Sequence, residues 1–406
     1  MGGTRTPTVR AAPMRILMAC MKFPMEPGQS YLTTELAEAL VAAGHEVEVL
    51  LIDWDAASGA PDGPCQDWNG VRVVRCTPRL IEGLGGLVRH ASKFVLTGRR
   101  ARHLTQEHFE LGRFDVFIAW TPALAFGPSV GLARKAGVPR RLLFIWDFFP
   151  DHYYEIGRIP GGPAVWLARA LEQRLMDAFD LLLCTLPQNA DYLRRRFRVR
   201  PDQAVGVTPI WSDAAPVPAT DRSAVRRRHD LPQGRPIAVF GGQLVEGRGF
   251  DQMLAAAAVG RERGSPLLFL FVGDGRLAPM LRAQASDNVL WRPAMPREAY
   301  LQLLTACDVG MIATVPGVSS FTIPSKTLDY LRAGLPVVAA LEAGNDFSAL
   351  LERYGVGRAV PFEDPLGFFT TAEALAGGPS VAAAAQLCLD EVFHVRHAVA
   401  AVLADG

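Results

Sequence analysis

The chain has 406 residues and a formal net charge of +1, with 49% hydrophobic and 20% charged residues. This length suits two domains, and the composition is that of a folded protein rather than a disordered one. A net charge near zero argues against a dedicated nucleic-acid-binding protein, and no apolar run approaches the roughly 20 residues that span a bilayer. Residues 1–13 are polar and the apolar run after them is short, so no secretory signal is expected.

Charge is unevenly distributed along the chain. Residues 1–200 contain 25 Lys and Arg against 20 Asp and Glu, whereas residues 201–406 contain 17 against 21. The near-neutral total therefore combines a basic first half with a slightly acidic second half. The six cysteines are scattered, with no C-x-x-C pair and no histidine at zinc-like spacing. We therefore expect free thiols and a reducing, cytoplasmic compartment.

The first half alternates short apolar runs with helical patterns. The apolar runs predict buried strands at residues 16–18, 47–52, 71–76, 116–120, 142–146 and 181–184. Helices are predicted over residues 32–43, 165–179 and 189–197, and one more ends near Gly137. Residues 201–236 contain several prolines and three consecutive arginines, which predict an inter-domain linker together with the lead into a second unit.

The second half repeats this alternation. Strands are predicted at residues 237–240, 267–272, 289–291, 309–313 and 336–340, with helices at 251–263, 276–285, 297–306, 325–333 and 347–354. Two such runs predict an α/β protein with two doubly wound, Rossmann-like domains that each contain a parallel sheet. We place the domains at residues 1–212 and 213–385, followed by a C-terminal helix at 386–406. The cleft at the carboxyl ends of the strands is the expected ligand site.

The most informative stretch surrounds Lys326. Pro324 disfavours helix before it and Ser325 is a good N-cap, so a helix is predicted to begin close to Lys326. A cation at a helix N-terminus opposes the helix dipole unless an anion lies nearby, and a phosphate would resolve the conflict. Asp329, one turn on, could accept hydrogen bonds from a ribose diol. The alternative is an ordinary surface pair of lysine and aspartate.

Two glycine-rich loops follow strands of the second half. Residues 241–249 form the first, where Arg248 could neutralise a diphosphate. It is neither a Walker A loop nor a G-x-G-x-x-G loop, so a nicotinamide cofactor is not favoured. Gly273-Asp274-Gly275 allows a tight turn and close approach of a ligand. Solvated strand–helix turns are the alternative for both loops.

The first half contributes three candidate segments. The loop with Gly28 lies just before a predicted helix and could face a diphosphate or an acceptor. Asp147, after a predicted strand, has aromatic neighbours that suit sugar or acceptor recognition, or else it caps a turn. Residues 80–104 mix leucines with arginines and could lie on an anionic membrane surface, although one solvated helix face is the commoner explanation.

Four stretches together resemble a known family. Residues 242–249 resemble a G-R-L-x-x-x-K-G loop, residues 273–275 a G-D-G turn, and residues 147–151 a D-x-x-P-[DE] stretch. Residues 324–339 resemble a P-S-K-x-x-E-Y-x-x-x-G-x-P-V-x-A block. In this order they are similar to retaining glycosyltransferases of family 4 with the GT-B fold, in the N-acetylfucosamine-transferase-like subgroup.

The resemblance implies a nucleotide-sugar donor, UDP-linked, bound mainly by the second domain, and transfer with retention of anomeric configuration. The first domain would bind the acceptor, either a lipid-linked saccharide or a small aglycone, and the C-terminal helix would cross back onto it. Asp147, Arg248 and Lys326 would be catalytic. The implied donor-binding residues are Gly28, Gly242, Gln243, Arg248, Gly273, Asp274, Gly275, Arg292, Pro293, Met295, Ser320, Phe321, Thr322, Ile323, Ser325, Lys326 and Asp329.

The sequence departs from the family pattern at three positions. Gln243 replaces an arginine, Phe321 replaces the first glutamate of an E-x7-E motif, and Asp329 replaces the second. No D-x-D signature lies in a suitable loop, so we expect neither a metal nor a cofactor. A cytoplasmic protein with peripheral contact at the inner membrane face would suit a lipid-linked acceptor; no nucleic-acid partner is expected. A sugar-nucleotide epimerase or hydrolase and a non-catalytic GT-B module are the alternatives.

Overall fold

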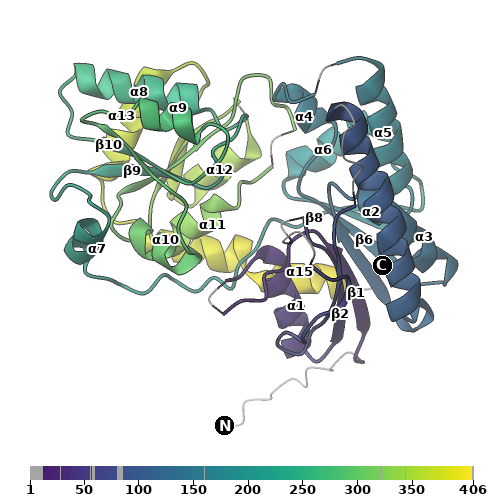
Figure 1. Ribbon diagram of the computed structural model, residues 1–406. Coiled ribbons are helices and arrows are strands. Elements are labelled where there is room, and N and C mark those ends of the chain that lie inside the picture. Colours follow the sequence, from purple (N-terminus) through teal and green to yellow (C-terminus); the bar gives the residue numbers. More distant parts are fainter. Residues whose placement is uncertain are drawn as a thin grey trace, which may run out of the picture.

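The computed structural model describes residues 12–27, 29–54, 56, 60–79, 86–159, 161–320, 322–342 and 344–404. Two α/β domains lie side by side, each with helices on both faces of a sheet (Figure 1). The first sheet has the order β3-β4-β2-β1-β5-β6-β7-β8, and the second has the order β11-β10-β9-β12-β13-β14. Every strand pair is parallel except β3 with β4.

The first domain contains eight strands and six α-helices among the described residues. The strands are β1 Arg15–Cys20, β2 Glu46–Ile52, β3 Gly63–Pro64, β4 Arg72–Cys76, β5 Val116–Trp120, β6 Arg140–Ile145, β7 Leu181–Cys184 and β8 Ala204–Val207. The helices are α1 Leu32–Ala42, α2 Gly86–His108, α3 Gly127–Lys135, α4 Asp151–Glu155, α5 Pro163–Met176 and α6 Pro187–Arg196. Residues 80–85 of the predicted basic stretch lie outside the described residues.

The second domain repeats this arrangement. Its strands are β9 Ile237–Gly241, β10 Leu268–Val272, β11 Val289–Arg292, β12 Val309–Ala313, β13 Val337–Ala340 and β14 Gly357–Val360. Its helices are α7 Arg222–Arg228, α8 Phe250–Glu262, α9 Ala278–Ala283, α10 Arg297–Leu304, α11 Lys326–Arg332, α12 Asp346–Arg353 and α13 Pro365–Ala376. The chain ends with α14 Ala382–Cys388, a π-helical turn Leu389–Phe393 and α15 Val395–Leu403.

The apolar runs form the central strands because both faces of each sheet are covered. In β1, Ile16 and Met18 join the core on one face, whereas Leu17 and Ala19 join the core on the other. All five residues of β5 are buried. A continuous apolar run is the pattern that a doubly covered parallel strand requires. Within the described residues, no helix is long and apolar enough to cross a bilayer.

The predicted linker is wrong at its start, whereas its end does lead into the second domain. Residues 204–207 form β8, the outermost strand of the first sheet, paired in parallel with β7. The three consecutive arginines lie on α7, where Arg226 is only 3% exposed. Its guanidinium donates to the carbonyl oxygens of Ala306 and Arg235 and pairs with Asp308. A buried arginine thus anchors α7 to the second domain, because its charge is paired and its donors are satisfied.

The C-terminal segment packs against the first domain. The helix α15 contacts α1, and the backbone of His394 pairs with that of Ser212. Arg140 Nη1 donates to the carbonyl oxygen of Val402 at 2.8 Å. The chain therefore passes between the domains twice, once after β8 and once between the π-helical turn and α15 (Figure 1).

Candidate active site

The glycine-rich loop after β9 packs tightly against the Gly273-Asp274-Gly275 turn after β10. Gly273 has φ 148°, and a Cβ atom there would lie 1.9 Å from the carbonyl oxygen of Gly242. The Leu244 N–H donates to the carbonyl oxygen of Asp274 at 2.9 Å. Only glycine permits this approach of two backbones. The two predicted loops are thereby brought together at the carboxyl ends of β9 and β10.

Lys326 begins α11 and reaches this loop. Its Nζ lies 4.4 Å from the centroid of the Phe240 ring, and its Cε lies 3.8 Å from where a Cβ atom at Gly242 would be. Burial and then the nearby charge of Arg248 lower the pKa of Lys326 well below its usual value, while Asp329 opposes the shift. In the part of the chain that the structure describes, neither Lys326 nor Arg248 has a salt bridge. Two neighbouring cations without an ion-pair partner form a site for an anion.

Arg248 also faces the first domain. Burial lowers the pKa of its guanidinium, and the carboxylate of Asp147 is the largest opposing influence. Asp147 follows β6, and its N–H donates to Thr121 Oγ1 at 3.0 Å, as does the N–H of Trp146. Burial raises the pKa of Asp147, with His152 and Arg248 opposing. The structure therefore brings Asp147, Arg248 and Lys326 to one region between the domains.

The short helix α4 carries further polar groups into this region. Burial lowers the pKa of His152, so its imidazole is neutral at pH 7. One ring nitrogen lies 3.4 Å from Ser320 Oγ of the second domain. Asp151, 1% exposed, holds α4 in place by accepting hydrogen bonds from Arg169 Nε at 3.0 Å and from the Tyr192 hydroxyl at 2.9 Å. The sequence marked Asp151 only as part of the D-x-x-P-[DE] stretch at residues 147–151 and did not predict these contacts of α4.

Glu155 joins α4 to the second domain and was not predicted. Its carboxylate accepts hydrogen bonds from the Ser319 hydroxyl and from both the hydroxyl and the N–H of Ser320. Nearby, Thr322 Oγ1 donates to the carbonyl oxygen of Trp146 at 2.9 Å. The loop between β12 and α11, which was predicted to bind the donor, is thus fixed to the first domain. No local sequence signal marks Glu155, because its partners lie 164 and 165 residues away.

Asp329 has a partner that the sequence did not suggest. Its two carboxylate oxygens accept from Arg297 Nη2 at 2.8 Å and Nη1 at 3.2 Å, and it is 8% exposed. The Asp329 carboxylate is therefore paired with Arg297 and is not free to bind a ribose diol. Arg297 comes from α10 and also faces Glu35 of α1, whose pKa burial raises to about 7.

The remaining predicted donor residues lie in different surroundings. The guanidinium of Arg292 donates to three backbone carbonyl oxygens, those of His229, Asp230 and Trp291, so it braces β11 rather than facing a base. The Asp274 carboxylate accepts from the N–H of Ala294, which ties residues 292–295 to the glycine turn. Gln243, Pro293 and Ser325 are exposed, Met295 is half-buried and Ile323 is buried. Gly28 and Phe321 lie outside the described residues.

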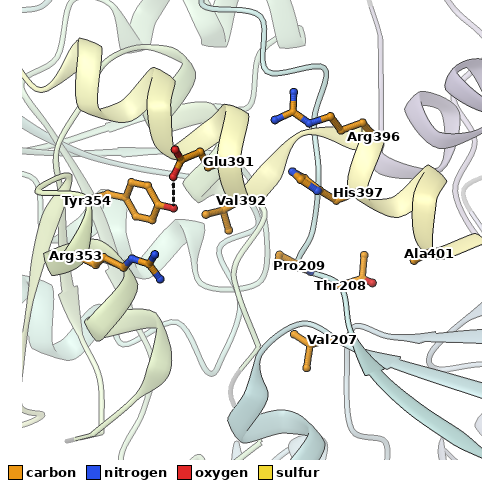
Figure 2. A pocket seen from close by; sticks show the side chains of 10 residues that line it. All are labelled: Val207, Thr208, Pro209, Arg353, Tyr354, Glu391, Val392, Arg396, His397 and Ala401. Atoms are coloured by element: carbon orange, nitrogen blue, oxygen red, sulfur yellow. Dashed lines mark hydrogen bonds between the residues drawn. The ribbon is translucent and has the colours of Figure 1, made fainter. Parts of the chain in front are cut away.

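A separate crevice of about 760 Å³ lies between the domains. Figure 2 shows side chains from β8, α12, the π-helical turn and α15 around it, with Tyr354 donating to Glu391 at 2.8 Å. None of the predicted site residues lines it. Its lining residues are Val207, Thr208, Pro209, Arg353, Tyr354, Glu391, Val392, Arg396, His397 and Ala401. Across the described ranges, no group of three or more His, Cys, Asp or Glu side chains is placed to hold a metal ion.

Comparison with known proteins defines the class. Residues 28–211 match the family model described as a glycosyl transferase 4-like domain, and residues 235–377 match that described as glycosyl transferases group 1. With two Rossmann-like domains in this order, the protein is a glycosyltransferase of the GT-B fold and hence an enzyme. The fold class and the enzyme class expected from the resemblance are confirmed.

Individual relatives are distant. The chain is 26% identical over 366 residues to WcaI of Escherichia coli (strain K12), whose name describes a colanic acid biosynthesis glycosyl transferase, with 84% of this chain and 86% of that protein covered. It is 25% identical over 343 residues to the D-inositol 3-phosphate glycosyltransferase of Streptomyces scabiei, covering 78% and 72%.

Solved structures confirm the fold. The Anabaena protein HepE, solved in complex with UDP and glucose, aligns with a TM-score of 0.66 at 15% identity, covering 94% of this chain and 96% of that chain. WaaG, a glycosyltransferase involved in lipopolysaccharide biosynthesis, aligns with a TM-score of 0.64 at 13% identity, covering 96% and 100%.

Proposed function

We propose that the enzyme transfers a sugar, an N-acetylhexosamine, from a UDP-sugar to a hydroxyl group of an acceptor with retention of anomeric configuration. The observation that carries this proposal is the pair of cations, Arg248 and Lys326, which lie together without an ion-pair partner among the described residues. A diphosphate supplies the missing negative charge. A UDP-linked donor is what the sequence resemblance implies, and HepE, a protein of the same fold, was solved with UDP and glucose.

The cation pair suits the leaving group of this reaction. The bond between the anomeric carbon and the diphosphate oxygen breaks, and the diphosphate departs with the electron pair as negative charge develops on it. Preorganised cations beside that oxygen stabilise the transition state more than the ground state. We propose that Arg248 and Lys326 do this without a metal ion. Transfer that is lost in EDTA and restored by magnesium or manganese would contradict the metal-free part.

Asp147 is placed to act on the acceptor side. Its carboxylate lies in the field of Arg248, and the N–H groups around it are held by Thr121. We propose that Asp147 accepts a hydrogen bond from the attacking hydroxyl and orients it toward the anomeric carbon. The new bond then forms between that oxygen and the anomeric carbon on the face that the diphosphate leaves, and the hydroxyl proton passes to the Asp147 carboxylate. Holding the two reacting groups together accounts for a large share of such rate accelerations.

The proposal is tested by transfer assays with a panel of UDP-sugars and other nucleotide sugars, preceded by a thermal-shift screen for binding. UDP-N-acetylhexosamines should raise the melting temperature most and should be consumed when an acceptor is present. Transfer from a GDP- or ADP-sugar alone would overturn the choice of base. Inverted configuration in the product would overturn retention.

A second reaction is favoured by one observation. A sugar-nucleotide epimerase or hydrolase needs an acid–base pair beside the sugar, and His152 and Asp147 lie close enough for the charge of each to shift the pKa of the other. Such a pair can exchange protons with a bound sugar or activate water. Product analysis without acceptor separates the reactions: an epimerised or hydrolysed sugar formed as fast as the transferred product would favour this alternative.

A further inference from the structure

The outer face of α5 is apolar and exposed. Trp166 is 75% exposed, Leu167 is 62% and Leu171 is 48%. They follow helical spacing on one side of α5, whose opposite side buries Val165, Leu175 and Met176 in the first domain. Tyr154 of α4 is 50% exposed, and its ring lies against Gly161 just before α5 begins. We call Tyr154, Trp166, Leu167 and Leu171 the α5 patch.

This grouping is unusual for a solvated surface. Four of the eight large hydrophobic side chains that are exposed in the described part of the chain belong to the α5 patch. Single exposed apolar residues are normal, whereas a cluster marks a surface that binds something. Figure 1 places α5 on the side of the first domain that faces away from the second domain.

The exposed charges on α5 and on the segment between α4 and α5 are positive. The only acidic residue of α5 is Glu172, which is fully buried. Arg174 is exposed and lies one turn after Leu171, and Arg158, between α4 and α5, is exposed with its guanidinium 5.4 Å from the centroid of the Tyr153 ring. Over the residues that the structure describes, neither arginine makes a salt bridge.

We propose that the α5 patch docks the enzyme on an anionic lipid bilayer. An amphipathic helix with tryptophan and leucine on its outer face and arginine at its border is the form that binds in the interfacial plane of a membrane. Anionic headgroups would pair with Arg158 and Arg174. A two-fold dimer over the same patch would instead bring the arginines of both copies into one interface, where α5 offers no exposed acid.

The position of the patch bears on the acceptor. The helix α4 is five residues long, and it carries His152 beside Ser320 in the candidate site and Tyr154 in the α5 patch. An acceptor could therefore have its reacting hydroxyl near Asp147 in the candidate site while its hydrocarbon part lies in the bilayer beside the α5 patch. The acceptor class inferred here, a membrane-embedded amphiphile, rests on the proposed function, whereas the docking surface does not.

Vesicle flotation of the full chain tests the docking surface. Wild-type protein should float with vesicles that mix phosphatidylcholine and phosphatidylglycerol, and less with phosphatidylcholine alone or at high salt. The triple variant Trp166→Ala, Leu167→Ala, Leu171→Ala should lower the vesicle partition coefficient about tenfold or more. Each of these side chains, when buried in the bilayer, contributes a sizeable part of the free energy of binding. The matched control Leu366→Ala, Leu387→Ala changes two exposed leucines of the second half and should float like wild type.

Three outcomes would overturn the docking surface. They are wild-type protein that does not bind anionic vesicles, a triple variant that binds as well as wild type, and a wild-type dimer in light scattering that the triple variant loses. Binding of a UDP-sugar to the same variants, measured by thermal shift, checks that their fold is intact. It also keeps the two proposals apart, because donor binding can fail while flotation succeeds.

Discussion

The two sides of the candidate site, which we propose bind the donor and the acceptor, are built in different ways. On the donor side, glycines with positive φ and the first residue of α11 place the groups, so each feature has a local cause in the sequence. On the acceptor side, α4 is held by Asp151 and Glu155 through partners that are distant in the chain. A local motif positions charge on one side, and tertiary contacts position it on the other. The two sides should therefore respond differently to substitution.

The largest effect should come from the donor-side cations. Lys326→Ala removes a charge that only the diphosphate would satisfy, so turnover should fall by a factor of about 10² to 10³, in the range known for loss of one preorganised transition-state donor. The matched control is Lys135→Ala, an exposed lysine at the end of α3, which should leave turnover unchanged. Steady-state transfer kinetics measure both. Near-wild-type turnover in Lys326→Ala would remove the basis for the phosphate site.

Asp147→Asn separates the two sides most directly. It keeps the shape of the side chain but weakens the acceptor for the attacking hydroxyl, so kcat should fall by about 10²-fold while UDP affinity stays the same. Calorimetric titration with UDP and transfer kinetics on one preparation give both values. If UDP affinity fell in parallel with kcat, Asp147 would belong to donor binding instead.

A smaller effect is expected at the contact between the domains. Glu155→Gln keeps one acceptor oxygen, replaces the other with an NH2 donor and removes the charge, and a charge-assisted hydrogen bond contributes about 1.5 to 3 kcal/mol. We expect kcat/KM to fall about tenfold, with little change in melting temperature. Glu262→Gln, an exposed glutamate at the end of α8, is the control. A loss as large as that of Asp147→Asn would assign Glu155 a direct chemical role.

The smallest effect concerns stability on the acceptor side. Glu172 is fully buried, neither carboxylate oxygen has a hydrogen-bond partner, and burial, with Asp147 nearby, raises its pKa to about 8. A raised pKa means that its contribution to stability is complete below the unfolded pKa near 4.5 and is lost as pH rises toward 8.

Glu172→Gln cannot ionise, so its melting temperature relative to wild type should rise by a few degrees between pH 5 and pH 8. Calorimetric scans at both pH values measure the difference. A difference that does not change with pH would show that Glu172 is already ionised when folded.

Much of the donor side could be predicted from the sequence because its causes are local. Gly273 and Lys326 stand in motifs where a backbone conformation or a helix start dictates the residue. The pairing of Asp329 with Arg297, and of Glu155 with Ser320, could not be predicted, because each partner comes from a different helix or domain. The strand β8 was assigned to a linker because its four residues are only partly buried and carry no strong apolar signal.

The packing of α15 on α1 has a consequence for how the domains can be separated. The core of the first domain includes Leu36 of α1 together with Ala398 and Val402 from the end of the chain. The first domain is thus complete only with residues that follow the whole second domain. A chain cut after β8 would expose this apolar surface, whereas a circularly permuted chain with the C-terminal segment joined ahead of β1 would keep it covered. The second domain is, in this sense, an insertion within the first.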